Sequence, residues 1–74
     1  MAKSNQHVIP HADGWAVRSE NTARVGSVHS TQEEAILRAT EIAKQQHVEV
    51  LIHGRDGQIR ERNSFGNDPF PPKG

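Results

Sequence analysis

The 74-residue sequence has no cysteine, and its aromatic side chains are limited to one Trp and two Phe. The absence of cysteine excludes disulfides, thiol nucleophiles, iron–sulfur clusters and cysteine-based zinc sites, and it is compatible with a reducing cytosol. Because only 32% of the residues are hydrophobic, the core must be built from aliphatic side chains around Trp15, with Phe65 as a further candidate. A chain this short forms one domain with a thin stability margin.

An excess of charge of one sign is also absent, because nine Lys and Arg balance nine Asp and Glu. A strongly basic chain would indicate a nucleic-acid partner, and this balance does not. Long hydrophobic runs are missing as well, and the opening MAKSNQHVIPHADG predicts neither a signal peptide nor a membrane span. We therefore expect a cytoplasmic protein without membrane contact.

Turn residues divide the chain into short strands. Asp13-Gly14 and Asp56-Gly57 each separate two apolar stretches, which is a strong β-hairpin signal because glycine accepts positive φ. Pro10 cannot donate a ladder hydrogen bond, so the first strand is expected at a sheet edge or broken at that residue. The expected strands are 7–11, 15–20, 25–29, 47–53 and about 58–65, with 1–6 as a polar lead-in and 66–74 as a proline-rich extended tail.

One helix is expected between the third and fourth strands. Ser30 with Glu33, or Thr31 with Glu34, can form a capping box at its start, and the helix should run to about Gln46. Its apolar stripe is small in volume, which allows a close approach to a sheet. The stripe consists of Ala35, Ala39, Ile42, Ala43 and Gln46, with Ile36 on its flank. Leu37 points to the opposite side.

The order of elements predicts an α+β fold in which one helix packs on one face of an antiparallel β-sheet of about five short strands, in the sequence order β-β-β-α-β-β. In the strand over 47–53, Val48, Val50 and Ile52 share one face, and Glu49, Leu51 and His53 share the other. Residues 1–74 form a single small domain.

Several stretches resemble a small bacterial family known only as domain of unknown function twenty-one eighty-eight. The matching segments are His-Val-Ile-Pro at 7–10, Asp-Gly-Trp-Ala-Val-Arg at 13–18, Thr-Gln-Glu-Glu-Ala at 31–35, Ile-His-Gly-Arg-Asp-Gly-Gln-Ile at 52–59, Ser-Phe-Gly-Asn-Asp-Pro at 64–69 and the closing Pro-Pro-Lys-Gly. The resemblance implies a stand-alone bacterial domain of this size and supplies no catalytic residues. Phe65 stands where the family pattern has a tyrosine.

The residues do not indicate catalysis, a metal or a cofactor. His7 and His11 lie in a strand interrupted by Pro10, roughly 13 Å apart, which is too far for shared coordination. Convergence of distant histidines, such as His29 with His53, stays open. No serine lies in a nucleophile elbow, and the aspartates at 13 and 56 fit turn formation. We expect a protein that is not an enzyme.

Nucleic-acid binding is one functional hypothesis. If Trp15, Val17, Val48, Val50 and Ile52 face the helix, Arg18, Leu51 and His53 lie on the open face of the sheet. Ile59 packed inward would place Arg60 and Arg62 on the same open face, with Arg55 at the turn. A basic sheet face can follow a phosphate backbone. Glu49 shares this face, and no exposed aromatic side chain is available for base stacking.

A protein-interaction module is the other hypothesis, and it is slightly favoured because it requires the least special chemistry. Leu37, Leu51 and Phe70 offer apolar contact points, and an edge strand could pair with another chain or with a second copy. We therefore expect a small non-catalytic bacterial binding module of unknown partner. The alternative is a nucleic-acid-binding protein that uses Arg18, His53, Arg55, Arg60 and Arg62.

Overall fold

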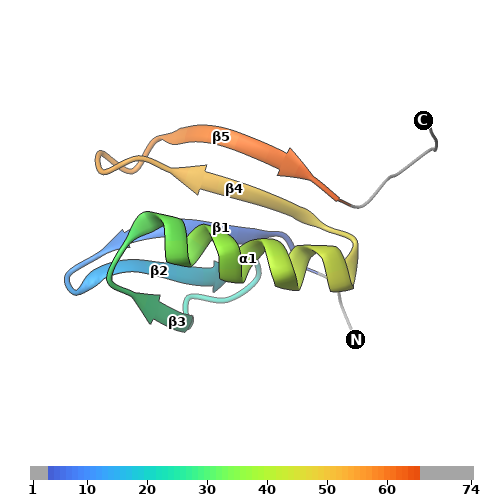
Figure 1. Ribbon diagram of the computed structural model, residues 1–74, viewed down its shortest axis with the longest axis horizontal. Coiled ribbons are helices and arrows are strands. Elements are labelled where there is room, and N and C mark those ends of the chain that lie inside the picture. Colours follow the sequence, from blue (N-terminus) through green and yellow to red (C-terminus); the bar gives the residue numbers. More distant parts are fainter. Residues whose placement is uncertain (1–3, 66–74) are drawn as a thin grey trace.

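The structure, a computed structural model, describes residues 4–65 and confirms the α+β class. Five strands form one sheet, and one helix lies across one of its faces (Figure 1). The elements are β1 (Gln6–His11), β2 (Gly14–Ser19), β3 (Val25–His29), α1 (Gln32–Gln46), β4 (Glu49–His53) and β5 (Ile59–Ser64). They follow the predicted order.

The strands are arranged in the spatial order β3-β2-β1-β4-β5. Three neighbouring pairs are antiparallel, but β1 and β4 are parallel, so the sheet is mixed rather than wholly antiparallel. The parallel pair arises because the chain leaves β3, crosses the sheet as α1 and returns on the far side of β1. A crossover of this kind joins strands of the same direction, and a tight hairpin cannot.

The first strand, β1, lies at the centre of the sheet. The expectation from Pro10, that this strand lies at an edge or is broken at that residue, is therefore wrong. Both neighbours of β1 are accommodated because its ladder with β4 covers only Gln6, His7 and Val8. The ladder therefore ends before Pro10, whose missing N–H is not needed there. Pairing with β2 continues past Pro10, opposite Trp15.

The predicted polar lead-in ends earlier than expected, because Gln6 is part of β1 and is only 2% exposed. Its Nε2 donates to the Ser4 carbonyl oxygen at 2.9 Å and to Ser19 Oγ at 3.2 Å. The Asn5 side chain accepts a bond from the Glu49 amide at 2.9 Å. These bonds tie the start of the described chain to β2 and β4.

The two ends of α1 are closed by different devices. Thr31 is the N-cap, and its hydroxyl accepts a bond from the Glu34 amide at 3.2 Å, which decides between the two predicted caps. The C-cap is His47, with φ 58° in the left-handed region. The prediction that His47 begins a strand is therefore wrong, and β4 starts at Glu49.

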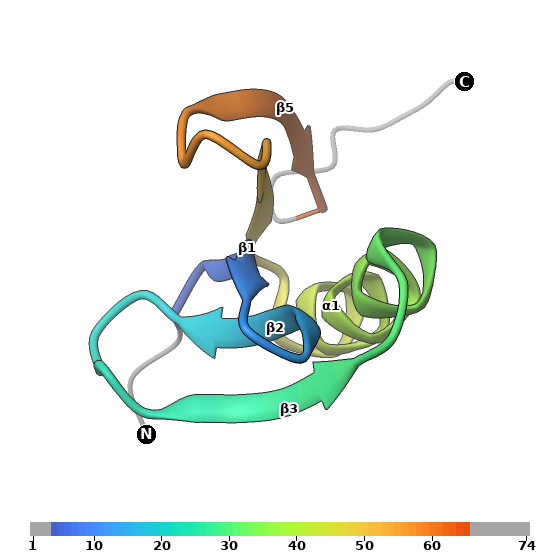
Figure 2. The same ribbon diagram turned by 90° about the vertical axis from the view of Figure 1, so that its left-hand side faces the viewer.

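The core lies between α1 and the sheet and is aliphatic apart from Trp15. The small stripe of α1 allows the helix to lie close to the strands, as predicted. The buried cluster consists of Val8, Trp15, Val17, Ala35, Ala39, Ala43, Val48, Val50 and Ile52, with Ile36, Ile42 and Phe65 packed against its margin. Figure 2 shows the helix beside β1 and β2 on this single face.

Lys44 lies over the Phe65 ring, 5.9 Å from its centre, at the end of α1. The predicted tail, including Phe70, lies outside the described residues. No helix within the described part of the chain is long and apolar enough to cross a membrane.

Candidate interaction surface on the open face of the sheet

The face of the sheet opposite α1 is built from two rows of side chains that run across all five strands. Strand pairing places Val28 beside Ala16, and Ala16 beside Ile9. On the other side of β1, Val8 pairs with Ile52, so the next residues, Ile9 and His53, lie at the same level of the sheet. His53 in turn pairs with Ile59. We call Val28, Ala16, Ile9, His53 and Ile59 the isoleucine row. The parallel row, here called the arginine row, consists of Val25, Arg18, His7, Leu51 and Arg62.

The isoleucine row is open to solvent at both ends. Val28 is 44% exposed on β3, and Ile59 is 51% exposed on β5. The prediction that Ile59 packs inward is therefore wrong. Its pairing is shifted, because Ile52 pairs with Glu61 and His53 with Ile59. This bulge leaves one extra residue, Arg60, in β5 and turns Ile59 to the open face.

Leu51 lies on the predicted face, but it is only 7% exposed. It sits in the arginine row between His7 and Arg62, whose larger side chains flank it. The prediction that Leu51 is an exposed apolar contact is therefore wrong. The other predicted contact, Leu37, is 66% exposed on the outer side of α1.

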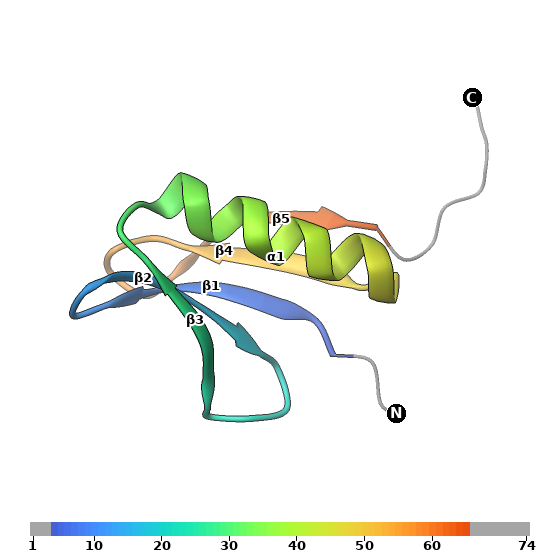
Figure 3. The same cartoon turned by 60° about the horizontal axis from the view of Figure 1, so that its bottom comes forward.

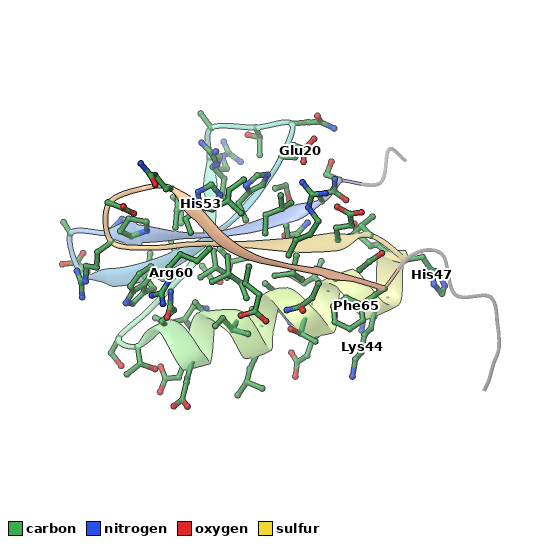
Figure 4. The ribbon with its side chains drawn as sticks, turned by 90° about the horizontal axis from the view of Figure 1, so that it is seen from above. Glu20, Lys44, His47, His53, Arg60 and Phe65 are labelled. Carbon is green, nitrogen blue, oxygen red and sulfur yellow. The ribbon has the colours of Figure 1, made fainter. Side chains whose placement is uncertain are left out.

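The four predicted arginines are divided among three places. Arg18 and Arg62 lie in the arginine row. Arg55 lies over the Trp15 ring at 5.1 Å from its centre, at the margin of the helix side. Arg60 lines a recess with Ile36 of α1, so it lies on the helix side rather than on the open face. Figure 4 shows Arg60 toward the helix and His53 on the other side of the sheet.

Arg18 and Arg62 differ in their polar contacts. Nε of Arg62 lies 3.7 Å from a carboxylate oxygen of Glu49, and both side chains are substantially exposed, so this ion pair is weak. Nε of Arg18 is buried and has no hydrogen-bond partner within the part of the chain that the structure describes. A buried guanidinium N–H without an acceptor is unfavourable.

Two histidines and one glutamate form a connected chain on this face. His7 Nε2 lies 3.2 Å from Glu20 Oε1, and His7 Nδ1 lies 2.9 Å from His53 Nε2. The chain ends where His53 Nδ1 lies 3.0 Å from the Gly57 carbonyl oxygen. The two rings are tilted by 38° with their centres 5.1 Å apart.

The geometry of this chain fixes how many protons it needs. The Glu20 carboxylate and the Gly57 carbonyl only accept, so His7 Nε2 and His53 Nδ1 must each carry a proton. The contact between the rings needs one more. All three contacts are hydrogen bonds at once only when the two rings together hold one proton more than two neutral imidazoles do.

Glu20 is held in its charged form by this arrangement. The hydrogen bond from His7, and then the bond from Asn5 Nδ2 at 3.1 Å, keep the pKa of the Glu20 carboxyl below its ordinary value of 4.5. The carboxylate therefore places a negative charge at the edge of the face, beside His7.

The pairing of His7 with His53 is not visible in the sequence, because it depends on the parallel contact between β1 and β4. The sequence left open that His29 and His53 converge, and the structure does not bring these two histidines together. His29 is on the helix side and contacts Ser27 Oγ at 2.8 Å. Among residues 4–65, no group of three or more His, Cys, Asp or Glu side chains could hold a metal ion.

Comparison with known proteins agrees with the motifs. Residues 6–65 match the family described as uncharacterized protein conserved in bacteria, DUF2188. The chain belongs to the DUF2188 family. This match extends from the first residue of β1 to the residue after β5, so the family domain and the described fold coincide.

A curated relative is the uncharacterized protein YdaT of Bacillus subtilis (strain 168), which is 42% identical over 62 residues. The match covers 84% of this chain but 41% of YdaT, so the chain spans about two fifths of that relative's length. No solved structure matches the chain.

Proposed function

We propose that this DUF2188 domain is a non-catalytic protein-interaction module that docks through the open face of its sheet, and that a second copy of the chain is the partner. The observation that carries the proposal is the isoleucine row. Its apolar side chains Val28, Ile9 and Ile59 come from β3, β1 and β5, and the two at the opposite ends of the row are about half exposed. Exposed apolar side chains on one face of a sheet favour association with another apolar surface.

The charges on this face favour a protein over a polyanion. The same face carries the arginines Arg18 and Arg62 and the carboxylates of Glu20 and Glu49, so both signs of charge are present. A nucleic acid would meet two carboxylates beside the two arginines. A second copy of the same face presents carboxylates for the arginines.

The size of the face predicts weak association. Five strands about 4.8 Å apart and five residues long at about 3.3 Å per residue give roughly 400 Å² per copy. The total of about 800 Å² is below the roughly 1,200 Å² that stable complexes bury. We therefore expect a dimer that forms at high concentration rather than an obligate one.

Sedimentation velocity over a concentration series up to about 1 mM tests the proposal, since a Kd near 1 mM is at the weak limit of specific association. The native chain should show a rising sedimentation coefficient. Val28→Asp and Ile59→Asp should each remove the rise, because they place a charge at opposite ends of the row. Leu37→Asp, on the outer side of α1, is the matched control and should behave like the native chain.

Two results would contradict the proposal. A native chain that stays monomeric at about 1 mM would exclude self-association of useful strength. A rise abolished by Leu37→Asp, but not by the row variants, would assign the contact to the helix.

The alternative function, nucleic-acid binding, has one supporting observation, which is that Arg18 and Arg62 lie in the same row of the open face. It is tested by an NMR titration with short single- and double-stranded oligonucleotides at low and physiological salt. Salt-sensitive shifts at Arg18, His53 and Arg62 that are lost in Arg18→Ala would favour this alternative. Arg60→Ala is the control, because Arg60 lies on the helix side.

A further inference from the structure

A second surface feature lies on the opposite side of the sheet, where β3 and α1 diverge. In Figure 3 the C-terminal end of β3 lies near the start of α1, and the N-terminal end of β3 lies away from the helix. The space between them is a groove of about 460 Å³. Its walls are the second half of α1, the strands β2 and β3, and the connection between these strands. The lining residues are Gln6, Val17, Ser19, Thr22, Arg24, Gly26, Ser27, Arg38, Ile42, Gln45 and Gln46.

The charge of this groove is of one sign. Arg24 projects from the β2–β3 connection and Arg38 from α1, and no carboxylate is among the lining residues. Arg38 has one ion pair, with Glu41 at 3.4 Å, and both side chains are more than half exposed. A solvent-exposed pair of this kind is worth little, so Arg38 can exchange Glu41 for a ligand at small cost. Two exposed guanidinium groups that line one groove suit an anion, which each can bind through two N–H groups.

The floor of the groove combines the apolar side chains of Val17 and Ile42 with polar groups whose orientation is fixed. Both amide hydrogens of Gln6 are used, one by the Ser4 carbonyl and one by Ser19 Oγ. The Gln6 side chain is 2% exposed, so its amide cannot turn freely. Its Oε1 is therefore an acceptor, and the Ser19 hydroxyl, which accepts from Gln6, keeps its own hydrogen to donate. This floor matches hydroxyl groups, each of which donates and accepts.

From these features we infer that the groove binds a small phosphorylated polyol, with the phosphate held by Arg24 and Arg38 and the hydroxyls by Ser19 and Gln6. The volume falls in the range of small-molecule sites, which begins near 300 Å³, and a sugar phosphate fits it. Gly26 keeps the groove open on the β3 side, because its position carries no side chain. The site is separated from the open face by the sheet, so it does not depend on the proposed function.

The test is an NMR titration of the full chain with ribose 5-phosphate, with ribose and inorganic phosphate as matched half-ligands. We expect saturable shifts at the amides of Ser19, Ser27 and Gln46, with ribose 5-phosphate binding at least about tenfold more tightly than either half-ligand. Arg24→Gln and Arg38→Gln should each weaken binding by about tenfold, the effect of losing one charge-assisted contact. Arg62→Gln, on the other face, should leave binding unchanged.

The backbone spectra of the variants without ligand report whether each is folded, and both arginines are exposed enough for substitution to be tolerated. The inference is overturned if shifts at the groove are absent or do not saturate. It is also overturned if inorganic phosphate binds as tightly as ribose 5-phosphate, or if Arg62→Gln weakens binding as much as the groove variants do. Self-association is measured without these ligands, so either proposal can fail alone.

Discussion

At the residue scale, Trp15 shows how far composition alone can locate a core. It is the only tryptophan in a chain with few aromatics, and from β2 it is buried in the core between the sheet and α1. The guanidinium of Arg55 covers the ring at 5.1 Å. A single large aromatic side chain thus carries a large share of the apolar area of an otherwise aliphatic core.

Replacement of Trp15 by alanine should lower the free energy of unfolding by about 3–5 kcal/mol, because it leaves a cavity where the largest side chain of the core was. Urea denaturation followed by far-UV circular dichroism measures the loss. Arg55→Ala is the matched control, and it should lower the unfolding free energy by about 1 kcal/mol or less, the value of an exposed cation–π contact. A loss below about 1 kcal/mol for Trp15→Ala would refute the importance of the ring.

Glu20 makes stability depend on acid pH. Its pKa in the folded chain is lowered, chiefly by the bond from His7, so its contribution is present above the ordinary value of 4.5 and is lost as the pH falls through the folded pKa. Glu20→Gln should therefore be less stable than the native chain at about pH 6, and the two should converge toward about pH 3. The urea midpoint of both chains across that range measures this. A difference that is constant with pH would show that Glu20 acts by shape and not by charge.

At the scale of elements, the helix start was predictable and its end was not. The Thr31 cap follows a local rule, in which a hydroxyl accepts from an amide three residues later. His47 had been assigned to the following strand because it precedes an alternating apolar run. The chain instead needs a left-handed residue at this position to turn from α1 into β4. Glycine is the usual choice there, and a histidine gives no such signal.

His47→Gly should raise the free energy of unfolding by up to about 1 kcal/mol, because glycine has no Cβ to clash at positive φ. The gain is reduced by the greater freedom of glycine in the unfolded chain. Thermal unfolding monitored by circular dichroism measures the effect. His47→Ala is the control, since it removes the imidazole but keeps the Cβ, and it should not stabilise the chain. If alanine stabilised as much as glycine, the imidazole rather than the backbone would be the source of strain.

At the scale of the whole molecule, local patterns were sufficient for the class of fold but not for its topology. Alternation in the strand over 47–53 and the small helical stripe both follow from side-chain periodicity, and they predicted an α+β fold with one covered face. The parallel contact of β1 with β4 joins residues more than forty positions apart, such as Gln6 and Val50. No local signal encodes such a contact, so the burial of Leu51 beside His7 could not be predicted. The positions of Ile59 and Arg60 depend instead on the bulge between β4 and β5, which the sequence does not mark either.

The arrangement predicts where the sheet is most resistant to opening. β1 and β4 each have a strand on both sides and lie beneath α1, so native-state hydrogen exchange should be slowest for amides such as those of Val8 and Val50. Amides of β3 and β5 should exchange faster, because each strand has one neighbour. Exchange measured by NMR at neutral pH ranks them. Equal protection across all five strands would indicate that the sheet opens only as a whole.

The central place of β1 also has a consequence for the nascent chain. As the protein leaves the ribosome, β1, β2 and β3 can pair at once, since they are joined by short turns. One side of β1 then remains without its partner until residue 53 has emerged, after a whole helix has been made. An unpaired strand edge invites contact with other chains. The parallel ladder over Gln6, His7 and Val8 is only three residues long, so little of that edge is at risk while synthesis is completed.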